Sequence, residues 1–450
     1  MRYIVKHIPC GKIRGVDTLK GYSYFSNIPY ATAVRWERPV QMTSWEGEYD
    51  ASTPTPYCSQ LGEFSTAVSA TGRFYGYENI VKQAVRYSED CQRLNIWTPN
   101  GAQKAPVLVY IHGGSYCTGG STAPSYCAAG YAQKGLVAVT INYRLNLFAS
   151  AVGGGHTGNY GLWDQITALQ WIRENIAAFG GDPDCVTVMG ESAGAMSVQD
   201  LVLSPLAGGL FHRAIMMSGG GILPKEFGRR PAAEAEAVWE RIRNAMGAED
   251  WAQLQKAPAD KLFHTWTKLT AEYKYITPAT PVVDGITIPA LPEELADSGN
   301  VNGVPTVIGF LSEDMWPNTL YEAALDWGIR MEKVGKAPVY GYYFDRQLPG
   351  SDDGAFHGCD IRYAFGTFDT CWRPFEETDY RISENMMDYF ASFAATGKPA
   401  TSTLPTWEPL GQKQTDFLHF GDEPCAMVQV PKERLLSFQA LGKPFPTRNA

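Results

Sequence analysis

Short apolar runs alternate with helical patterns along much of this 450-residue chain. The runs are continuously apolar and are bounded by turn residues, which is typical of strands buried on both faces of a sheet. Between two of them, apolar residues from Leu162 to Phe179 recur every three or four positions, as in an amphipathic helix. The runs are Val107–Ile111, Val137–Tyr143, Val186–Met189, Ala214–Met217 and Val304–Phe310. This alternation predicts an α/β fold with a mostly parallel central sheet flanked by helices.

No linker or block of charge divides the chain, so we expect one domain over residues 1–450. The stretch around 224–281 is more helical and more charged than its surroundings, and we interpret it as a helical insertion over the sheet. Ligands of open α/β sheets bind beyond the carboxyl ends of the strands. Ser192, the pair Gly113-Gly114 and the pair Glu313-Asp314 all follow predicted strands, so they are expected on one rim.

Composition excludes several classes of partner. The formal net charge is −9 and no basic cluster is present, which argues against nucleic acid or an anionic membrane. The first ten residues lack the apolar core of a signal peptide, and no apolar run reaches membrane-spanning length, so we expect a cytoplasmic location. Nine cysteines, an odd number without close metal-ligand spacing, predict mostly reduced thiols and no metal site.

The segment Gly190-Glu191-Ser192-Ala193-Gly194 lies between a predicted strand and a helix-compatible stretch. Glycines two residues before and two after a serine allow backbone to pass close on both sides of a sharp turn, which presents the serine Oγ outward. The five-residue pattern is weak alone and gains its weight from this strand–turn–helix context. It predicts that Ser192 is a nucleophile.

A serine alcohol needs a base, and the base needs an acid that holds it in the right tautomer. In chains with such an elbow the order is serine, then acid, then histidine. Only His357 and His419 follow an acid placed after the fifth strand. His357 lies in a loop between glycines, whereas His419 has the pattern of a sheet or surface position, so His357 is the predicted base.

Acyl transfer also needs backbone N–H groups aimed at the tetrahedral oxygen. His112-Gly113-Gly114-Ser115 follows the strand that ends at Ile111 and matches a turn that supplies such donors. We expect the N–H groups of Gly114, Ser115 and Ala193 to form this oxyanion hole.

These residues together resemble the type-B carboxylesterases, an α/β-hydrolase family that includes cholinesterases and bacterial p-nitrobenzyl esterases. The resemblance runs nearly from end to end of the chain. The matching segments are 28–31, 35–36, 88–99, 112–114, 142–145, 158–165, 179–183, 190–194 and 354–358.

The resemblance implies Ser192 as nucleophile, His357 as base and Asp314 as the orienting acid. The family usually has Glu at the acid position, and the neighbouring Glu313 remains the alternative. Glu191 and Ser218 are expected around the histidine and the acid. The resemblance also implies that Arg35 pairs with Glu89 and Arg144 with Asp164, as ion pairs of the scaffold.

Cys58 and Cys91 align with cysteines that close a disulfide loop in the family. Since a cytoplasmic protein is expected, we expect this pair to be reduced. The enclosed segment offers Phe74, Tyr75 and Tyr77 as aromatic walls for the substrate, and Tyr116 is a further predicted substrate contact.

Only 43 positions separate Asp314 from His357, fewer than the family normally has. We therefore expect a shortened helical cap around 315–338 and a shallow, open mouth. The predicted activity is hydrolysis of short-acyl or aryl esters of small molecules, without a cofactor, by a monomer or homodimer. The alternatives are a catalytically silent binding or adhesion protein, and an amidase, lactonase or acyltransferase with the same triad.

Overall fold

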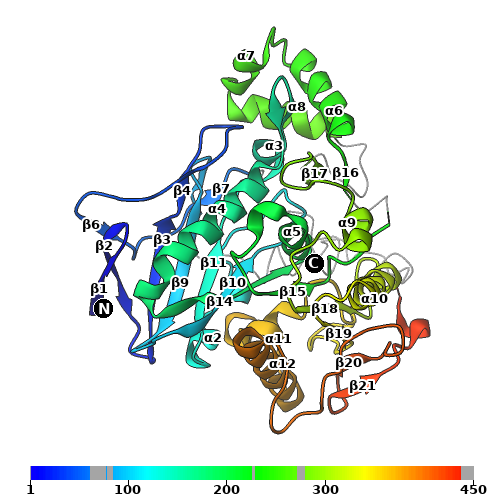
Figure 1. The fold of residues 1–450 in the computed structure, drawn as a ribbon. Coiled ribbons are helices and arrows are strands. Elements are labelled where there is room, and N and C mark those ends of the chain that lie inside the picture. The colour runs from blue at the N-terminus through cyan, green and yellow to red at the C-terminus, as the bar shows by residue number, and fades with distance from the viewer. Residues whose placement is uncertain (1, 61–77, 79–84, 225–228, 271–278, 437–450) are drawn as a thin grey trace, which may run out of the picture.

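The structure is a computed structural model that describes residues 2–60, 78, 85–224, 229–270 and 279–436 (Figure 1). In this part of the chain, thirteen strands form one large sheet. Twelve of them follow one another in space as β1 (Arg2–Ile8), β2 (Gly11–Asp17), β3 (Tyr22–Pro29), β9 (Arg93–Pro99), β11 (Val137–Ile141), β10 (Ala105–Ile111), β14 (Gly181–Glu191), β15 (Arg213–Met217), β18 (Thr306–Leu311), β19 (Val339–Phe344), β20 (Phe417–Phe420) and β21 (Ala426–Val428); β6 (Glu48–Asp50) pairs with β2.

The central strands from β11 to β20 are parallel, and the pairs at both edges are antiparallel except for the parallel pair of β2 and β6. The five apolar runs of the sequence all lie in this parallel part, as β10, β11, β14, β15 and β18. The predicted α/β architecture is therefore confirmed. Short two-stranded ladders lie outside the large sheet, namely β4 (Ala31–Thr32) with β5 (Val40–Gln41), β7 (Tyr57–Cys58) with β8 (Tyr87–Ser88), β12 (Val152–Gly153) with β13 (His156–Thr157), and β16 (Arg230–Pro231) with β17 (Val282–Val283).

Helices cover both faces of the sheet, and alternate strand residues point to the two sides. Val107 and Val109 of β10 belong to one core, whereas Leu108 and Tyr110 belong to the other. The first core is covered by α4 (Tyr160–Asn175), α5 (Ala193–Leu203) and α10 (Pro317–Lys333), and the second by α2 (Ala129–Gln133), α11 (Ile361–Phe365) and α12 (Glu377–Thr396). The helix predicted from Leu162 to Phe179 is α4, continued by a 3-10 turn at Ile176–Phe179.

The segments 224–281 and 315–338 lie differently with respect to the large sheet. Within 224–281 the structure has α6 (Ala232–Ala245), α7 (Trp251–Gln255) and α8 (Ala259–Thr270), which stand together at the top of Figure 1, away from the large sheet. The segment 315–338 consists mainly of α10, which packs on β18 and β19 beside α9 (Pro292–Ser298). A short α3 (Asn146–Ala149) follows β11.

The expected ion pairs of the scaffold are present. Arg35 Nε donates to Glu89 at 2.8 Å, and the buried Arg144 Nη2 donates to Asp164 at 2.8 Å. The expectation of a reduced Cys58 and Cys91 is wrong, because the two residues form a disulfide. Their chain segments lie in the paired strands β7 and just beyond β8, which brings the two α-carbons to 4.9 Å. In the described part of the chain, the other seven cysteines do not form disulfides.

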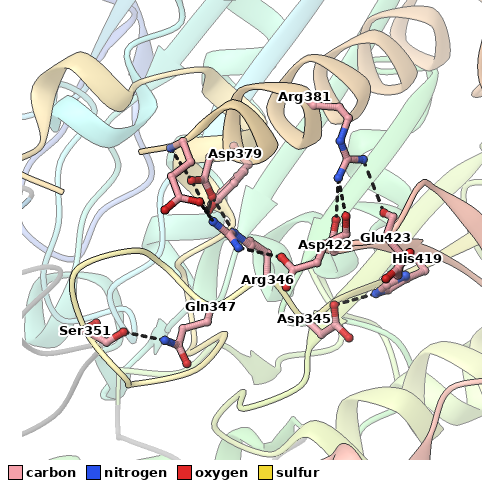
Figure 2. Close-up of polar contacts among 12 residues, drawn as sticks. Asp345, Arg346, Gln347, Ser351, Asp379, Arg381, His419, Asp422 and Glu423 are labelled. Carbon is pink, nitrogen blue, oxygen red and sulfur yellow. Dashed lines mark hydrogen bonds and ion pairs between the residues drawn. The ribbon is translucent and has the colours of Figure 1, made fainter. Parts of the chain in front are cut away.

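A network of charges fixes the chain where it leaves β19 (Figure 2). Arg346 donates to Asp379 of α12 at 2.9 Å and to Asp422 at 2.8 Å. Asp345 pairs with His419 of β20 at 2.7 Å. His419, the other histidine that the sequence offered as a base, is therefore paired with an aspartate that is far from the elbow in sequence. These contacts fasten β19, β20 and α12 together at the start of the loop that carries His357.

Among the described residues, no helix has both the length and the apolar composition needed to cross a membrane.

Candidate active site

Ser192 occupies the turn between β14 and α5 with φ +57° and ψ −124°, a conformation that residues with a side chain rarely adopt. Its N–H donates to the carbonyl of Met217 at 2.9 Å, which ties the turn to the end of β15. A Cβ at Gly190 would lie 2.4 Å from the backbone of Gly194, and one at Gly194 would lie 2.1 Å from the carbonyl oxygen of Ile111. Only glycine fits at these two positions, so the backbone forms a tight elbow around a half-buried serine.

His357 lies between Ser192 and Asp314. Its Nδ1 is 2.6 Å from Asp314 Oδ1 and its Nε2 is 2.8 Å from Ser192 Oγ. With the proton on Nδ1, the ring donates to the carboxylate and accepts from the serine hydroxyl, as a general base requires. The three residues follow β14, β18 and β19, three parallel strands whose carboxyl ends meet at one edge of the sheet.

The two neighbouring carboxylates have different partners. Asp314 is fully buried, and its carboxylate also accepts the N–H groups of Met315 at 2.8 Å and Leu311 at 3.2 Å. Glu313 instead accepts the N–H of Ala355 at 2.8 Å, and its backbone bridges to Phe356. Asp314 therefore orients the imidazole, whereas Glu313 anchors the loop that carries it.

The electrostatics of the site favour a protonated imidazole. Burial lowers the pKa of His357, but the negative charges of Asp314 and Glu191 outweigh burial and raise the pKa to about 9. Glu191 is fully buried, with Oε1 3.3 Å from His357 Nε2. Burial raises the pKa of Asp314, yet the facing His357 dominates and lowers it below its ordinary value. A positive charge on His357 is thus stabilised from two sides.

The predicted oxyanion donors lie around the elbow. Gly114 and Ser115 have φ +108° and +55°, and Ala193 is the first residue of α5, where helical N–H groups lack intrahelical acceptors. A Cβ at Gly113 would lie 2.7 Å from Glu191 and 3.0 Å from the Ser192 Cβ, so the glycine turn packs directly against the nucleophile. The turn after β10 and the start of α5 thus border the same space.

The remaining predicted site residues differ in their surroundings. Ser218 is buried and its Oγ makes no well-oriented hydrogen bond, but it lies close enough to Asp314 to help lower the pKa of that carboxyl. Tyr116 is also buried, and its hydroxyl accepts from Arg229 at 2.8 Å, so its role as a substrate contact stays a prediction. Phe74, Tyr75 and Tyr77 lie outside the described residues.

Two buried groups near the site, Asp360 and His112, were given no role of their own in the sequence analysis, although His112 was part of the predicted glycine turn. Asp360 accepts the hydroxyl of Tyr342 at 2.8 Å, and burial raises its pKa to about 7. Burial lowers the pKa of His112 to about 4, and its Nδ1 lies 2.8 Å from the carbonyl of Gly113 while its ring stacks on Tyr143. His112 is therefore a neutral support for the glycine turn. Its position before two glycines was the available signal, whereas Asp360 has no distinguishing pattern in the sequence.

Acidic, histidine and cysteine side chains do not gather into a metal-binding group anywhere in the described part of the chain. The chemistry available to the site is that of a serine, an imidazole, two carboxylates and backbone N–H groups. This set is suited to acyl transfer through a covalent serine intermediate.

Comparison with known proteins agrees with this chemistry. Residues 3–324 and 314–439 match the model of the carboxylesterase family. The chain belongs to the carboxylesterase family. It is 30% identical to carboxylesterase 1C of Rattus norvegicus over 91% of this chain and 88% of that protein. It is 29% identical to the para-nitrobenzyl esterase of Bacillus subtilis over 92% of this chain and 94% of that protein.

Solved structures give the same result for the fold. A PNB esterase structure superposes with a TM-score of 0.83 at 26% identity and covers 98% of this chain and 99% of that one. A thermophilic PNB esterase gives a TM-score of 0.81 at 27% identity. The fold is thus that of the α/β-hydrolases, as predicted, and this carboxylesterase is a carboxylic ester hydrolase.

Proposed function

We propose that this carboxylesterase hydrolyses short-acyl or aryl esters of small molecules by a two-step serine mechanism. Ser192 attacks the ester carbonyl while His357 accepts its proton, and Asp314 stabilises the imidazolium. The N–H groups of Gly114, Ser115 and Ala193 bind the oxyanion. His357 then protonates the departing alcohol, and water activated by the same ring releases the acid.

The observation that supports this proposal is the unbroken chain of hydrogen bonds from Ser192 through His357 to Asp314. The same chain serves amide, lactone and acyl-transfer reactions, which all pass through a serine acyl-enzyme. Ester hydrolysis is favoured over these because the two relatives named above are a carboxylesterase and a para-nitrobenzyl esterase. In this proposal, residues 1–450 form one catalytic domain that acts as a monomer or homodimer.

A cytoplasmic location stays a prediction. The Cys58–Cys91 disulfide counts against it, because disulfides persist in oxidising compartments.

The test is hydrolysis of p-nitrophenyl esters from acetate to palmitate by the wild type and by Ser192→Ala. We expect turnover to peak at short chains and kcat to fall by roughly 10⁴ to 10⁶-fold in the variant, as when a triad serine is removed. Ser298→Ala, an exposed serine at the end of α9, is the matched control and should retain full activity. A Ser192→Ala protein that keeps most of its activity would rule out the assignment.

A further inference from the structure

Gln60 is a buried glutamine whose carboxamide binds both backbone polar groups of a single residue, Gly119. Its Nε2 donates to the Gly119 carbonyl at 2.8 Å, and its Oε1 accepts the Gly119 N–H at 2.9 Å. The side chain is only 9% exposed, so these bonds are shielded from water. Gly119 ends the loop that begins with the predicted oxyanion donors Gly114 and Ser115. One side chain therefore holds the end of that loop in a single orientation.

The backbone that carries Gln60 is itself fixed. Cys58, two residues earlier, lies in β7 and forms the disulfide to Cys91. Its carbonyl accepts a further hydrogen bond from Gln60 Nε2 at 3.0 Å. Between them, the N–H of Ser59 donates to the carbonyl of Ser88 in β8 at 3.0 Å. The carboxamide of Gln60 therefore has a defined position and direction.

Gly119 packs directly on the start of the glycine turn. Its φ is +107°, and a Cβ there would lie 2.6 Å from His112 Nδ1 and 2.8 Å from the Gly113 carbonyl oxygen. The same carbonyl oxygen lies 2.8 Å from His112 Nδ1. A peptide bond is planar and trans, so the Gly113 carbonyl and the Gly114 N–H point in opposite directions within one plane. Contacts that fix this carbonyl therefore also fix the direction of the Gly114 N–H.

The next peptide of the turn is fixed from within the same loop. The Gly114 carbonyl accepts the N–H groups of Cys117 at 2.9 Å and of Thr118 at 3.0 Å. This carbonyl shares its peptide plane with the N–H of Ser115, the second predicted donor. Because Thr118 directly precedes Gly119, a shift of Gly119 also disturbs the hydrogen bond from Thr118. Both predicted donors of the turn thus depend on where Gly119 is held.

We propose that Gln60 is a positioning residue for ester hydrolysis: by holding Gly119, it keeps the N–H groups of Gly114 and Ser115 directed at the oxygen of the tetrahedral intermediate. The inference rests on the proposed function, in which these N–H groups bind the oxyanion. Such donors stabilise a charge that develops only in the transition state. A small displacement of the donors therefore lowers kcat and leaves KM nearly unchanged.

Gln60→Glu tests this role, because it keeps an oxygen for the Gly119 N–H and turns a second oxygen toward the Gly119 carbonyl. We expect kcat on p-nitrophenyl acetate to fall by about 10²-fold, the effect of a displacement of about 1 Å, and KM to change less than threefold. Complete reaction with a p-nitrophenyl alkyl phosphonate counts the active sites, so unfolded protein does not lower the kcat obtained. Gln133→Glu, at an exposed position of α2, is the control and should keep both constants.

Binding of an aryl trifluoromethyl ketone separates positioning from a merely structural role. Ser192 Oγ adds to the ketone carbon, its proton passes to His357, and the ketone oxygen becomes an oxyanion like that of the tetrahedral intermediate. We expect the inhibition constant of the ketone to rise in Gln60→Glu by the factor by which kcat/KM falls. An unchanged kcat, or a lower kcat with an unchanged inhibition constant, would overturn the role of Gln60 and leave the proposed function intact. Absence of ester hydrolysis by the wild type would overturn both.

Gln60→Met provides a second variant in case Gln60→Glu does not fold. Methionine has a similar length and removes both hydrogen bonds to Gly119 without adding a charge. We expect kcat to fall and the inhibition constant of the ketone to rise together, each by about 10-fold, the effect of losing neutral hydrogen bonds. Wild-type values of both constants in Gln60→Met would overturn the proposal.

Discussion

His357 binds its proton more tightly than a free histidine does, because the carboxylates of Asp314 and Glu191 outweigh the effect of burial on its pKa. The general base must be neutral to accept the serine proton. Activity should therefore rise with pH through an inflection above 6.5, the ordinary pKa of histidine, and toward 9. The two charges that shift this inflection act over 2.6 Å and 3.3 Å.

Glu191→Gln should lower the pKa of His357, since it removes one of the two nearest negative charges. We expect the inflection of kcat/KM, measured from about pH 5 to 10, to move to lower pH by up to about one unit, the order of shift a single nearby charge produces. Glu377→Gln, at an exposed position in α12, is the control and should not move it. An unchanged or higher inflection in Glu191→Gln would show that Glu191 does not act on His357.

The adjacent carboxylates of Asp314 and Glu313 can be distinguished by the effect of their removal on kcat. Asp314→Asn should reduce kcat by about 10⁴-fold, because the amide favours the wrong tautomer of His357. Glu313→Gln weakens the anchor on Ala355 and the hydrogen bond from the Ser312 hydroxyl, but neither contact involves His357, so we expect a loss of about 10-fold and an unchanged pH inflection. Steady-state kinetics on p-nitrophenyl acetate over the same pH range measures the loss and the pH inflection for each of the two variants. A larger loss in Glu313→Gln than in Asp314→Asn would reverse the assignment.

At the scale of single residues, the sequence alone selected Ser192 and His357, which the structure places 2.8 Å apart, because an elbow and a glycine-flanked histidine each leave a local pattern. It did not distinguish Asp314 from Glu313, since neighbouring acids differ only in where the turn after β18 directs them. Asp360 and the contacts of Gln60 were not predicted either. Their surroundings come from segments far apart in the chain, which no local pattern records.

Among the elements, the contact between α5 and the end of β10 constrains the elbow most strongly. At Gly194 a Cβ would lie 2.1 Å from the Ile111 carbonyl oxygen and 2.9 Å from the backbone of His112. Backbone atoms cannot move aside as a flexible side chain can. The helix can therefore begin directly after Ser192 only if this position carries no side chain.

Gly194→Ala should lower the free energy of unfolding by about 3 kcal/mol, at the upper end of the range for overpacking, or prevent folding. Gly208→Ala is the matched control, because the nearest atoms there lie at 3.3 Å and its φ is not positive. Urea denaturation of the two variants and the wild type gives the comparison. Equal stabilities would show that the elbow can open without penalty.

The strands of the parallel core were predictable because burial on both faces leaves continuous apolar runs. The run Val186–Met189 indicated β14, but the strand begins earlier, at polar residues of Gly181–Glu191. The antiparallel edge strands β1, β2 and β3 are mixed in polarity and were not identified. Their pairing is fixed by neighbours along the sheet rather than by their own pattern.

For the whole molecule, the alternation of apolar runs with helical patterns predicted the α/β fold, but the cysteine count did not predict the redox state of the cysteines. An odd number of cysteines suggested reduced thiols, whereas β7 and β8 bring Cys58 and Cys91 together. Counting cysteines cannot reveal this, because the pairing depends on two strands that meet only in the folded chain.

In the proposed mechanism the whole site works as one nucleophilic unit centred on Ser192. A p-nitrophenyl alkyl phosphonate tests it directly, because attack by the serine releases p-nitrophenol and leaves a phosphonyl group that water does not readily remove. Intact-mass measurement and peptide mapping follow the label, while residual activity is measured in parallel. We expect one phosphonyl group per chain, on Ser192, with activity lost in proportion to labelling. A label on another residue, or full activity with Ser192 labelled, would contradict it.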